Sequence, residues 1–330
     1  MEPIKTEKEA EMETYRVGQL VRDSRFEGFL MVRSAEKKTD KNGRDYVDLN
    51  LGDRTGEINA KIWNWDGLQE VPESGKPIKV RGLVQEYNGR MQMRIEKWRI
   101  LTPEDSLNPG DLVPSAPRSS EEMMAEIRET VESFSSENLK KLTLEMLETA
   151  GERLSWFPAA QRMHHAERSG LLHHMTDMLR LAKAAMEVYP WLNRDLLCAG
   201  VILHDLGKLE ELKSDESGNV TDYTRDGQLL GHLVRGITLL NQAAEKTGVT
   251  GEWVVLLEHM LLSHHGEPEY GSPRPPMFPE AEALHWIDMM DARMNTMKAA
   301  WEKTPEGAFS EKIFSLDRRV YHPWYTEDAE

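Results

Sequence analysis

The sequence predicts a multidomain α+β chain in which a small β-barrel is followed by an all-α domain. A length of 330 residues suits two domains. Before residue 101, apolar and polar residues alternate, which is the period of a half-buried strand. After residue 120, apolar residues recur at three- and four-residue spacing, which is typical of amphipathic helices. The stretch between these parts, residues 102–120, holds four prolines and predicts a linker.

Five short antiparallel strands are predicted in the first part. Val47, Leu49 and Leu51 alternate with polar residues, and the next segment repeats the pattern. Asn88-Gly89 lies between two further apolar-polar segments, and this dipeptide is a strong hairpin signal. Five strands in this length suit a small closed barrel such as the OB-fold. The predicted strands are 26–36, 44–51, 57–63 and the two halves of 77–101.

The helical part begins with a recognisable start signal. Ser119 is followed three residues later by Glu122, which is the pattern of a capping box. From there the helical spacing continues almost to the end of the chain. The expected boundaries are residues 1–102 for the barrel, 103–120 for the linker and 121–330 for the helical domain.

Charge is distributed unevenly along the chain. The net charge is −16, yet residues 14–102 hold 17 Lys and Arg against 13 Asp and Glu. The rest of the chain is strongly acidic. A basic balance confined to the barrel hints at a nucleic-acid surface there.

The cysteine count and the short apolar runs predict where in the cell the protein is located. Cys198 is the only cysteine, so a disulfide within the chain and a cysteine zinc site are excluded. The first thirteen residues are charged throughout, unlike a signal peptide. The longest apolar run, residues 196–203, is too short to span a bilayer. We expect a cytoplasmic protein without a membrane span.

Histidines gather in the helical part. Ten of the eleven lie between residues 164 and 285, several of them at the ends of apolar helical stretches. A buried imidazole needs a partner, and five helices that each offer one to the interior favour a shared metal ion. Imidazole and carboxylate ligands without thiolate suit Mn²⁺, Fe²⁺, Co²⁺, Ni²⁺ or Zn²⁺.

The order of these motifs resembles a known family. The segments "CAGVILHDLGKLEEL", "GQLLGHL", "LLSHHGEPEYGSPRPP" and "LHWIDMMDA" resemble the HD superfamily of metal-dependent phosphohydrolases. They are most similar to its branch of bacterial YhaM-type 3′→5′ exoribonucleases. The resemblance covers residues 14–325 and implies an OB-fold ahead of an HD domain.

The resemblance also implies a site with two metal ions, with Mn²⁺ as the expected ion. The implied ligands form two groups that share Asp205: His174, His204, Asp205 and Asp288 in one, and Asp205, His232, His264 and His265 in the other. A carboxylate can bridge two ions because it has two oxygens.

Other polar residues near these motifs have more than one candidate role. Besides His204 and Asp205, Lys208 is a candidate catalytic residue, since its charge can neutralise a substrate phosphate. The alternative is a solvated lysine at the end of a helix. Asp291 is expected to be a helical or supporting carboxylate. His164 and His165 are either structural or near the substrate.

One face of the barrel is a candidate RNA-binding surface. OB-folds bind oligonucleotides on the face of strands 2 and 3. An outward Tyr and Trp beside a lysine suit base stacking on a single strand. The alternative is that Trp63 and Trp65 cover the barrel mouth or pack on the helical domain. The candidate residues are Tyr46, Asn50, Asn59, Lys61 and Trp63.

The sequence therefore favours a 3′→5′ exoribonuclease that acts on single-stranded RNA. The metal-activated water and the release of nucleoside 5′-monophosphates are implied by the family resemblance. One alternative is an HD-type phosphohydrolase of a small nucleotide, such as a dNTP or a signalling nucleotide. Another is a non-catalytic, metal-stabilised nucleic-acid-binding module. Activity on single-stranded DNA and assembly into a homo-oligomer are left open by the sequence.

Overall fold

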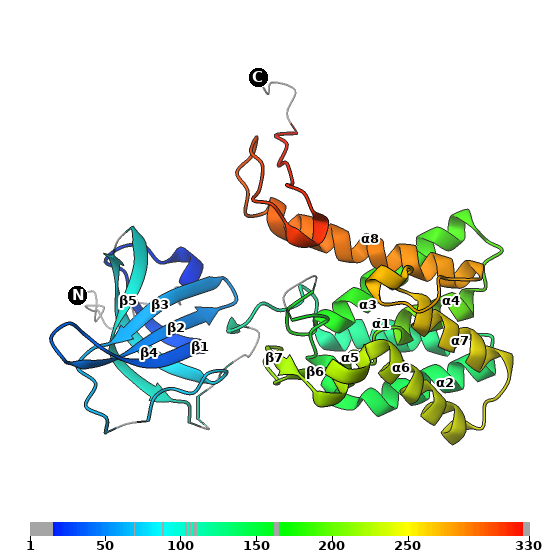
Figure 1. Cartoon of the computed structure of the whole chain (residues 1–330), viewed down its shortest axis with the longest axis horizontal. Helices are drawn as coiled ribbons and strands as arrows, with labels where there is room; N and C mark the ends of the chain where they lie inside the picture. Colours follow the sequence, from blue (N-terminus) through cyan, green and yellow to red (C-terminus); the bar gives the residue numbers. More distant parts are fainter. Residues whose placement is uncertain are drawn as a thin grey trace, which may run out of the picture. The chain divides into compact units, whose positions relative to one another are not determined.

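A computed structural model describes residues 16–68, 70–87, 89–102, 104–105, 107, 111–161 and 165–325. The chain divides into two compact units, Met1–Pro114 and Ser115–Glu330. Figure 1 traces both units along the chain, with strands in the first and mainly helices in the second.

The first unit is a closed five-stranded barrel with the strand order β1-β2-β3-β5-β4. All neighbouring strands pair antiparallel except β3 and β5, which pair parallel and close the barrel. The fold is the predicted OB-fold, although the parallel pair departs from the expected all-antiparallel arrangement. The elements are a 3₁₀ turn at Val17–Gln19, β1 (Arg25–Thr39), β2 (Asp45–Asp53), β3 (Gly56–Ile62), β4 (Pro77–Tyr87) and β5 (Arg90–Ile100).

The barrel core comes from the alternation seen in the sequence. Leu49 on β2 lies opposite Ala60 on β3, and both side chains are buried. Asn50 lies opposite Asn59 on the other face of the same two strands. Asn88, the first residue of the predicted hairpin turn, lies outside the described residues.

The second unit packs its helices around a single large apolar core. Every residue of α4 is buried except Arg194, so the apolar run around Cys198 forms the central helix of the unit. Figure 1 shows α8 running across α3 and α4, which both contact it. The helices are α1 (Ser120–Glu132), α2 (Glu137–Ala150), α3 (Gly170–Val188), α4 (Arg194–Leu203), α5 (Lys208–Glu211), α6 (Arg225–Thr247), α7 (Glu252–Ser263) and α8 (Pro279–Trp301).

Short elements complete this unit. The sequence patterns did not predict the hairpin of β6 (Leu212–Ser214) and β7 (Val220–Tyr223), which lies between α5 and α6. Three 3₁₀ turns lie at Gly151–Ser155, Pro268–Tyr270 and Phe314–Leu316. The start of α1 shows the N-cap half of the predicted capping box, because the Ser119 side chain accepts a hydrogen bond from the Glu122 amide at 3.2 Å. Within the described part of the chain, none of the helices has the length and apolarity to cross a membrane.

Two glycines position the central polar residues. A Cβ on Gly207 would lie 2.1 Å from the carbonyl oxygen of His232, so only glycine permits this approach of α5 and α6. Gly231 interrupts α6 with a φ of 69°, which is a left-handed conformation that favours glycine. Together they bring His232 close to the end of α4.

Candidate metal centre and nucleic-acid face

The structure brings all seven predicted metal ligands together inside the helical unit. His174 lies on α3, and His204 and Asp205 follow α4 directly. The remaining four, His232, His264, His265 and Asp288, come from α6, the end of α7 and α8. The site is deeply set, since His174 and His204 are fully buried and Asp205 is 2% exposed.

Each of the five histidines uses its Nδ1 atom to bind an oxygen of the protein. A backbone carbonyl only accepts, so the three histidines bound to carbonyls donate from Nδ1 and leave Nε2 unprotonated when neutral. Such outer partners orient metal-binding imidazoles. The Nδ1 partners are Asp291 Oδ2 for His174 (2.6 Å), Val201 O for His204 (2.8 Å), Glu211 Oε2 for His232 (2.9 Å), Leu261 O for His264 (2.9 Å) and Tyr270 O for His265 (2.9 Å).

The two oxygens of Asp205 face two different groups of Nε2 atoms. Oδ2 lies 3.3 Å from His204 Nε2 and 3.8 Å from His174 Nε2. Oδ1 lies 3.6 Å from His232 Nε2 and 3.7 Å from His264 Nε2. The carboxylate therefore has the geometry to join two neighbouring binding positions.

The donor atoms fit a divalent cation. Among the described residues, His204 Nε2 and Asp205 Oδ1 are buried without a hydrogen-bond partner, a costly state that a bound ion would relieve. Three sets of predicted ligands each have their ligand atoms within 4.8 Å of one another: His174, His204 and Asp205; His232, His264 and His265; and His204, His264 and Asp288. Imidazole with carboxylate is a donor set of first-row divalent metals.

Charges around Asp205 keep it ionised. Burial would raise the pKa of its carboxyl group, but the ammonium of Lys208 and the His204 imidazole hold that pKa well below its ordinary value. Lys208 Nζ lies 2.6 Å from Asp205 Oδ2. Burial also lowers the pKa of His264 strongly, which keeps its imidazole neutral and available to a metal.

His174 behaves differently. Burial lowers its pKa, but hydrogen bonds to Asp288 and Asp291 outweigh burial and raise the pKa to about 9. Its Nε2 lies 3.2 Å from Asp288 Oδ1. A metal that binds this imidazole must therefore displace a proton.

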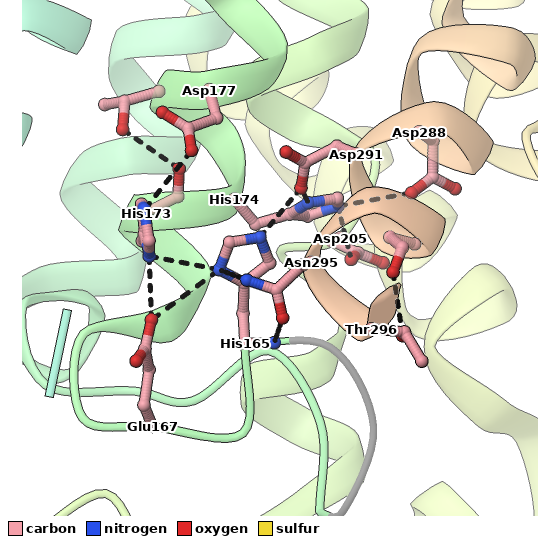
Figure 2. A network of polar contacts seen from close by, with 12 residues as sticks. His165, Glu167, His173, His174, Asp177, Asp205, Asp288, Asp291, Asn295 and Thr296 are labelled. Atoms are coloured by element: carbon pink, nitrogen blue, oxygen red, sulfur yellow. Dashed lines mark hydrogen bonds and ion pairs between the residues drawn. The ribbon is translucent and has the colours of Figure 1, made fainter. Parts of the chain in front are cut away.

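Asp291 supports His174 from the opposite side of the ring. Figure 2 shows its carboxylate on α8 between His174 and His165. The same oxygen, Oδ2, lies 2.6 Å from His174 Nδ1 and 2.8 Å from His165 Nε2. The sequence analysis expected a helical or supporting carboxylate at Asp291, and the contact with His174 is a supporting one. Glu211, which holds His232, had no signal in the sequence.

A polar network continues behind Asp291, away from Asp205. His173 Nδ1 lies 2.7 Å from Glu167 Oε1 and 3.1 Å from His165 Nδ1 (Figure 2). His173 Nε2 lies 3.2 Å from Asp177 Oδ2. His165 is buried in this network, whereas His164 lies outside the described residues. The structure therefore places His174, rather than His173, against Asp205.

A cleft of roughly 400 Å³ opens onto the predicted ligands. Asp205, His264, His265 and Asp288 line it together with Lys208. Its other walls are α8, the Pro268–Tyr270 turn and the Phe314–Leu316 turn. A substrate in this cleft would contact the candidate metal ligands directly.

Three of the five predicted RNA-binding residues form one cluster on the barrel. The rings of Tyr46 and Trp63 lie 4.9 Å apart, and Lys61 Nζ lies 4.8 Å from the Tyr46 ring centroid. Trp63 is 42% exposed, so its ring is accessible on the barrel. The cluster combines a cation with two accessible aromatic rings, as stacking platforms for single strands do.

The side chains of the two asparagines on this face already form hydrogen bonds with other residues of the barrel. Asn50 Nδ2 donates to Glu57 at 2.6 Å. Asn59 donates to Asp48 and accepts from Gln92 at 2.6 Å. Their amides must exchange these bonds before they contact a base. Beside them lies a groove of roughly 890 Å³ that includes Tyr87 and Arg90, which sequence reasoning missed.

Known proteins resemble both units. The model of the OB-fold nucleic acid binding domain matches residues 26–101, and the HD domain model matches residues 171–293. A Geobacillus sp. (strain WCH70) protein named 3′-5′ exoribonuclease YhaM is 42% identical over 311 residues, 93% of each chain. Its namesake in Listeria innocua is 41% identical over 309 residues, covering 93% of this chain and 96% of the relative. The Bacillus subtilis (strain 168) protein of that name is 40% identical over 295 residues, covering 89% and 93%. On this likeness along almost the whole length, the chain belongs to the YhaM family of 3′-5′ exoribonucleases.

Proposed function

We propose that this protein is a metal-dependent 3′→5′ exoribonuclease that removes nucleoside 5′-monophosphates from single-stranded RNA. The observation that carries the proposal is the cluster of five imidazoles and two carboxylates, Asp205 and Asp288, which opens onto a cleft. In this proposal residues 1–102 bind RNA, residues 103–120 link the domains and residues 121–330 carry out hydrolysis.

The proposed ligands divide the metal-binding work. His174, His204 and Asp288 would hold one ion, and His232, His264 and His265 would hold a second, with Asp205 shared between them. Manganese is the ion we expect, and Fe²⁺, Co²⁺, Ni²⁺ and Zn²⁺ suit the same donors. When bound, such ions lower the pKa of a water and neutralise charge on a phosphate.

The chain's own groups prepare the site for hydrolysis. Asp205 stays ionised because Lys208 lies 2.6 Å away. The ammonium of Lys208 also lines the cleft, which supports its role in neutralising a substrate phosphate. The carbonyls of Val201 and Leu261 hold two imidazoles with Nε2 directed at Asp205.

On the barrel, Tyr46, Lys61 and Trp63 are proposed to stack on RNA bases, with Asn50 and Asn59 beside them. Every base has a stacking face, so this cluster would accept RNA of any sequence and single-stranded DNA as well. The single buried Cys198 supports a reducing cytoplasm as the location. The oligomeric state stays an open prediction.

A time course with an unstructured, 5′-labelled RNA and Mn²⁺ tests the function. We expect a ladder that shortens from the 3′ end, with nucleoside 5′-monophosphates as products. Asp205→Ala should abolish it, whereas Asp222→Ala, at an exposed position on β7, should not. An RNA that stays intact with the wild-type protein contradicts the proposal, and free nucleotides would then be the next substrates to test.

A further inference from the structure

We propose that Arg293 binds a backbone phosphate of the RNA whose 3′ end lies in the cleft. This inference rests on the proposed exoribonuclease function and adds a substrate-binding residue to it. Arg293 lies on α8, five residues after the proposed ligand Asp288. Its side chain lines the same cleft as Asp205 and Asp288.

Arg293 and Lys208 are the two basic side chains among the described residues that line this cleft. They differ in how their charge is used. Lys208 is 12% exposed, and its ammonium is bound to Asp205 at 2.6 Å. Arg293 is half-buried, and within the described residues it makes no ion pair or hydrogen bond through its side chain. Its charge is therefore available to a ligand.

The chemistry of the ligand follows from that charge. Outside the barrel the chain is strongly acidic. Its negative charge therefore repels a polyanion that enters the cleft. A guanidinium offers several N–H donors in a planar fork, which matches two oxygens of one phosphate. An arginine that lines the cleft, and that has no acidic partner among the described residues, is therefore suited to bind the RNA backbone.

The position on α8 indicates which phosphate is bound. A helix rises about 1.5 Å per residue, so Arg293 begins about 7.5 Å along the axis from Asp288. The phosphate that is hydrolysed must lie against the proposed metal ligands, Asp205 and Asp288. Arg293 is thus placed to hold a neighbouring phosphate, which would keep the chain in register after each nucleotide is removed.

Substitution of Arg293 in the full-length protein tests this inference. We expect Arg293→Ala to raise KM for an unstructured RNA about tenfold or more, with a much smaller change in kcat. Loss of one phosphate contact should also reduce the steepness of log(kcat/KM) against log salt by about 0.7. Arg293→Lys should keep the salt dependence, because the charge is retained, and recover part of the affinity.

Lys298→Ala is the matched control. Lys298 lies on the same helix, is exposed and pairs at 3.9 Å with Glu302. It does not line the cleft, so we expect KM and the salt dependence to stay at the wild-type values. This control shows whether the loss of a positive charge elsewhere on α8 changes KM or the salt dependence.

RNAs that carry one neutral methylphosphonate linkage identify the phosphate. At one position upstream of the scissile bond, the neutral linkage should raise KM for the wild type but not for Arg293→Ala. An Arg293→Ala enzyme with wild-type KM and salt dependence would overturn the inference. So would a fall in kcat alone, or a loss of bound Mn²⁺. If the wild type leaves RNA intact, the proposed function itself has failed.

Discussion

Replacement of Asp291 by Asn tests whether the outer partner of His174 controls metal binding. Asp291 is 8% exposed, and one of its oxygens lies 2.6 Å from His174 Nδ1 and 2.8 Å from His165 Nε2. An asparagine keeps the shape and an acceptor oxygen, so the hydrogen bond to His174 persists without its charge.

The expected loss follows from these contacts. A hydrogen bond to a charged group contributes about 1.5–3 kcal/mol, and a neutral one about 0.5–1.5 kcal/mol. The difference of about 1–2 kcal/mol corresponds to about 5–30-fold in affinity. This range overlaps the lower part of the roughly 10–100-fold loss that outer-shell substitutions cause in other metal sites.

The measurement is the Mn²⁺ affinity of the metal-free protein by calorimetry, together with the Mn²⁺ concentration that gives half-maximal RNA hydrolysis. Asp177→Asn is the control, because Asp177 contacts His173 at 3.2 Å and not a proposed ligand. If Asp291→Asn binds Mn²⁺ within twofold of the wild type, the proposed role of Asp291 is wrong.

Three further predictions concern the fold, the barrel and the metal. Gly207→Ala should unfold or inactivate the helical unit, because its Cβ would lie 2.1 Å from the His232 carbonyl oxygen. Gly236→Ala should be tolerated, because its Cβ would lie 3.4 Å from the flexible Leu261 side chain, which is ordinary contact. Thermal melts of the two variants test this difference. Trp63→Ala should weaken RNA binding by about 5–150-fold, since one stacked base contributes about 1–3 kcal/mol. Trp191 is exposed in the helical unit, so Trp191→Ala should leave the RNA affinity unchanged. Fluorescence anisotropy titrations measure both affinities. Removal of metal by chelation should lower Tm, and Mn²⁺ at 100 times its Kd should then raise the free energy of unfolding by about 2.7 kcal/mol. If Mn²⁺ stabilises Asp205→Ala by the same amount, the ion does not bind at this site.

Local patterns predicted most of the secondary structure. The two-residue alternation at Val47, Leu49 and Leu51 shows directly which side chains face the barrel core, because strand side chains alternate between faces. The parallel pairing of β3 with β5 joins segments about 30 residues apart in sequence, as in Asn59 with Gln92. No local sequence pattern shows which distant strands pair or in which direction, so the sequence did not predict that a parallel pair closes the barrel.

The candidate site divides in the same way. The seven proposed metal-binding positions could be named because they lie in short motifs that resemble those of a known family. A supporting role was expected for Asp291, but its partner His174 on another helix was not named, and Glu211 as the partner of His232 was missed altogether. On the barrel, the outward direction of Asn59 was predictable, but its bond to Gln92 depends on the barrel closing.

The sequence by itself determined the two-domain order and the strand faces, because these depend on residue type and local spacing. Its resemblance to a known family indicated the set of imidazoles and carboxylates. The tertiary structure alone decided that the two oxygens of Asp205 face separate groups of Nε2 atoms. The tertiary structure also decided that Lys208 forms an ion pair with Asp205, whereas Arg293 lines the cleft without an acidic partner among the described residues. Such relations depend on distances between helices, which are set by packing of the whole core rather than by any one segment.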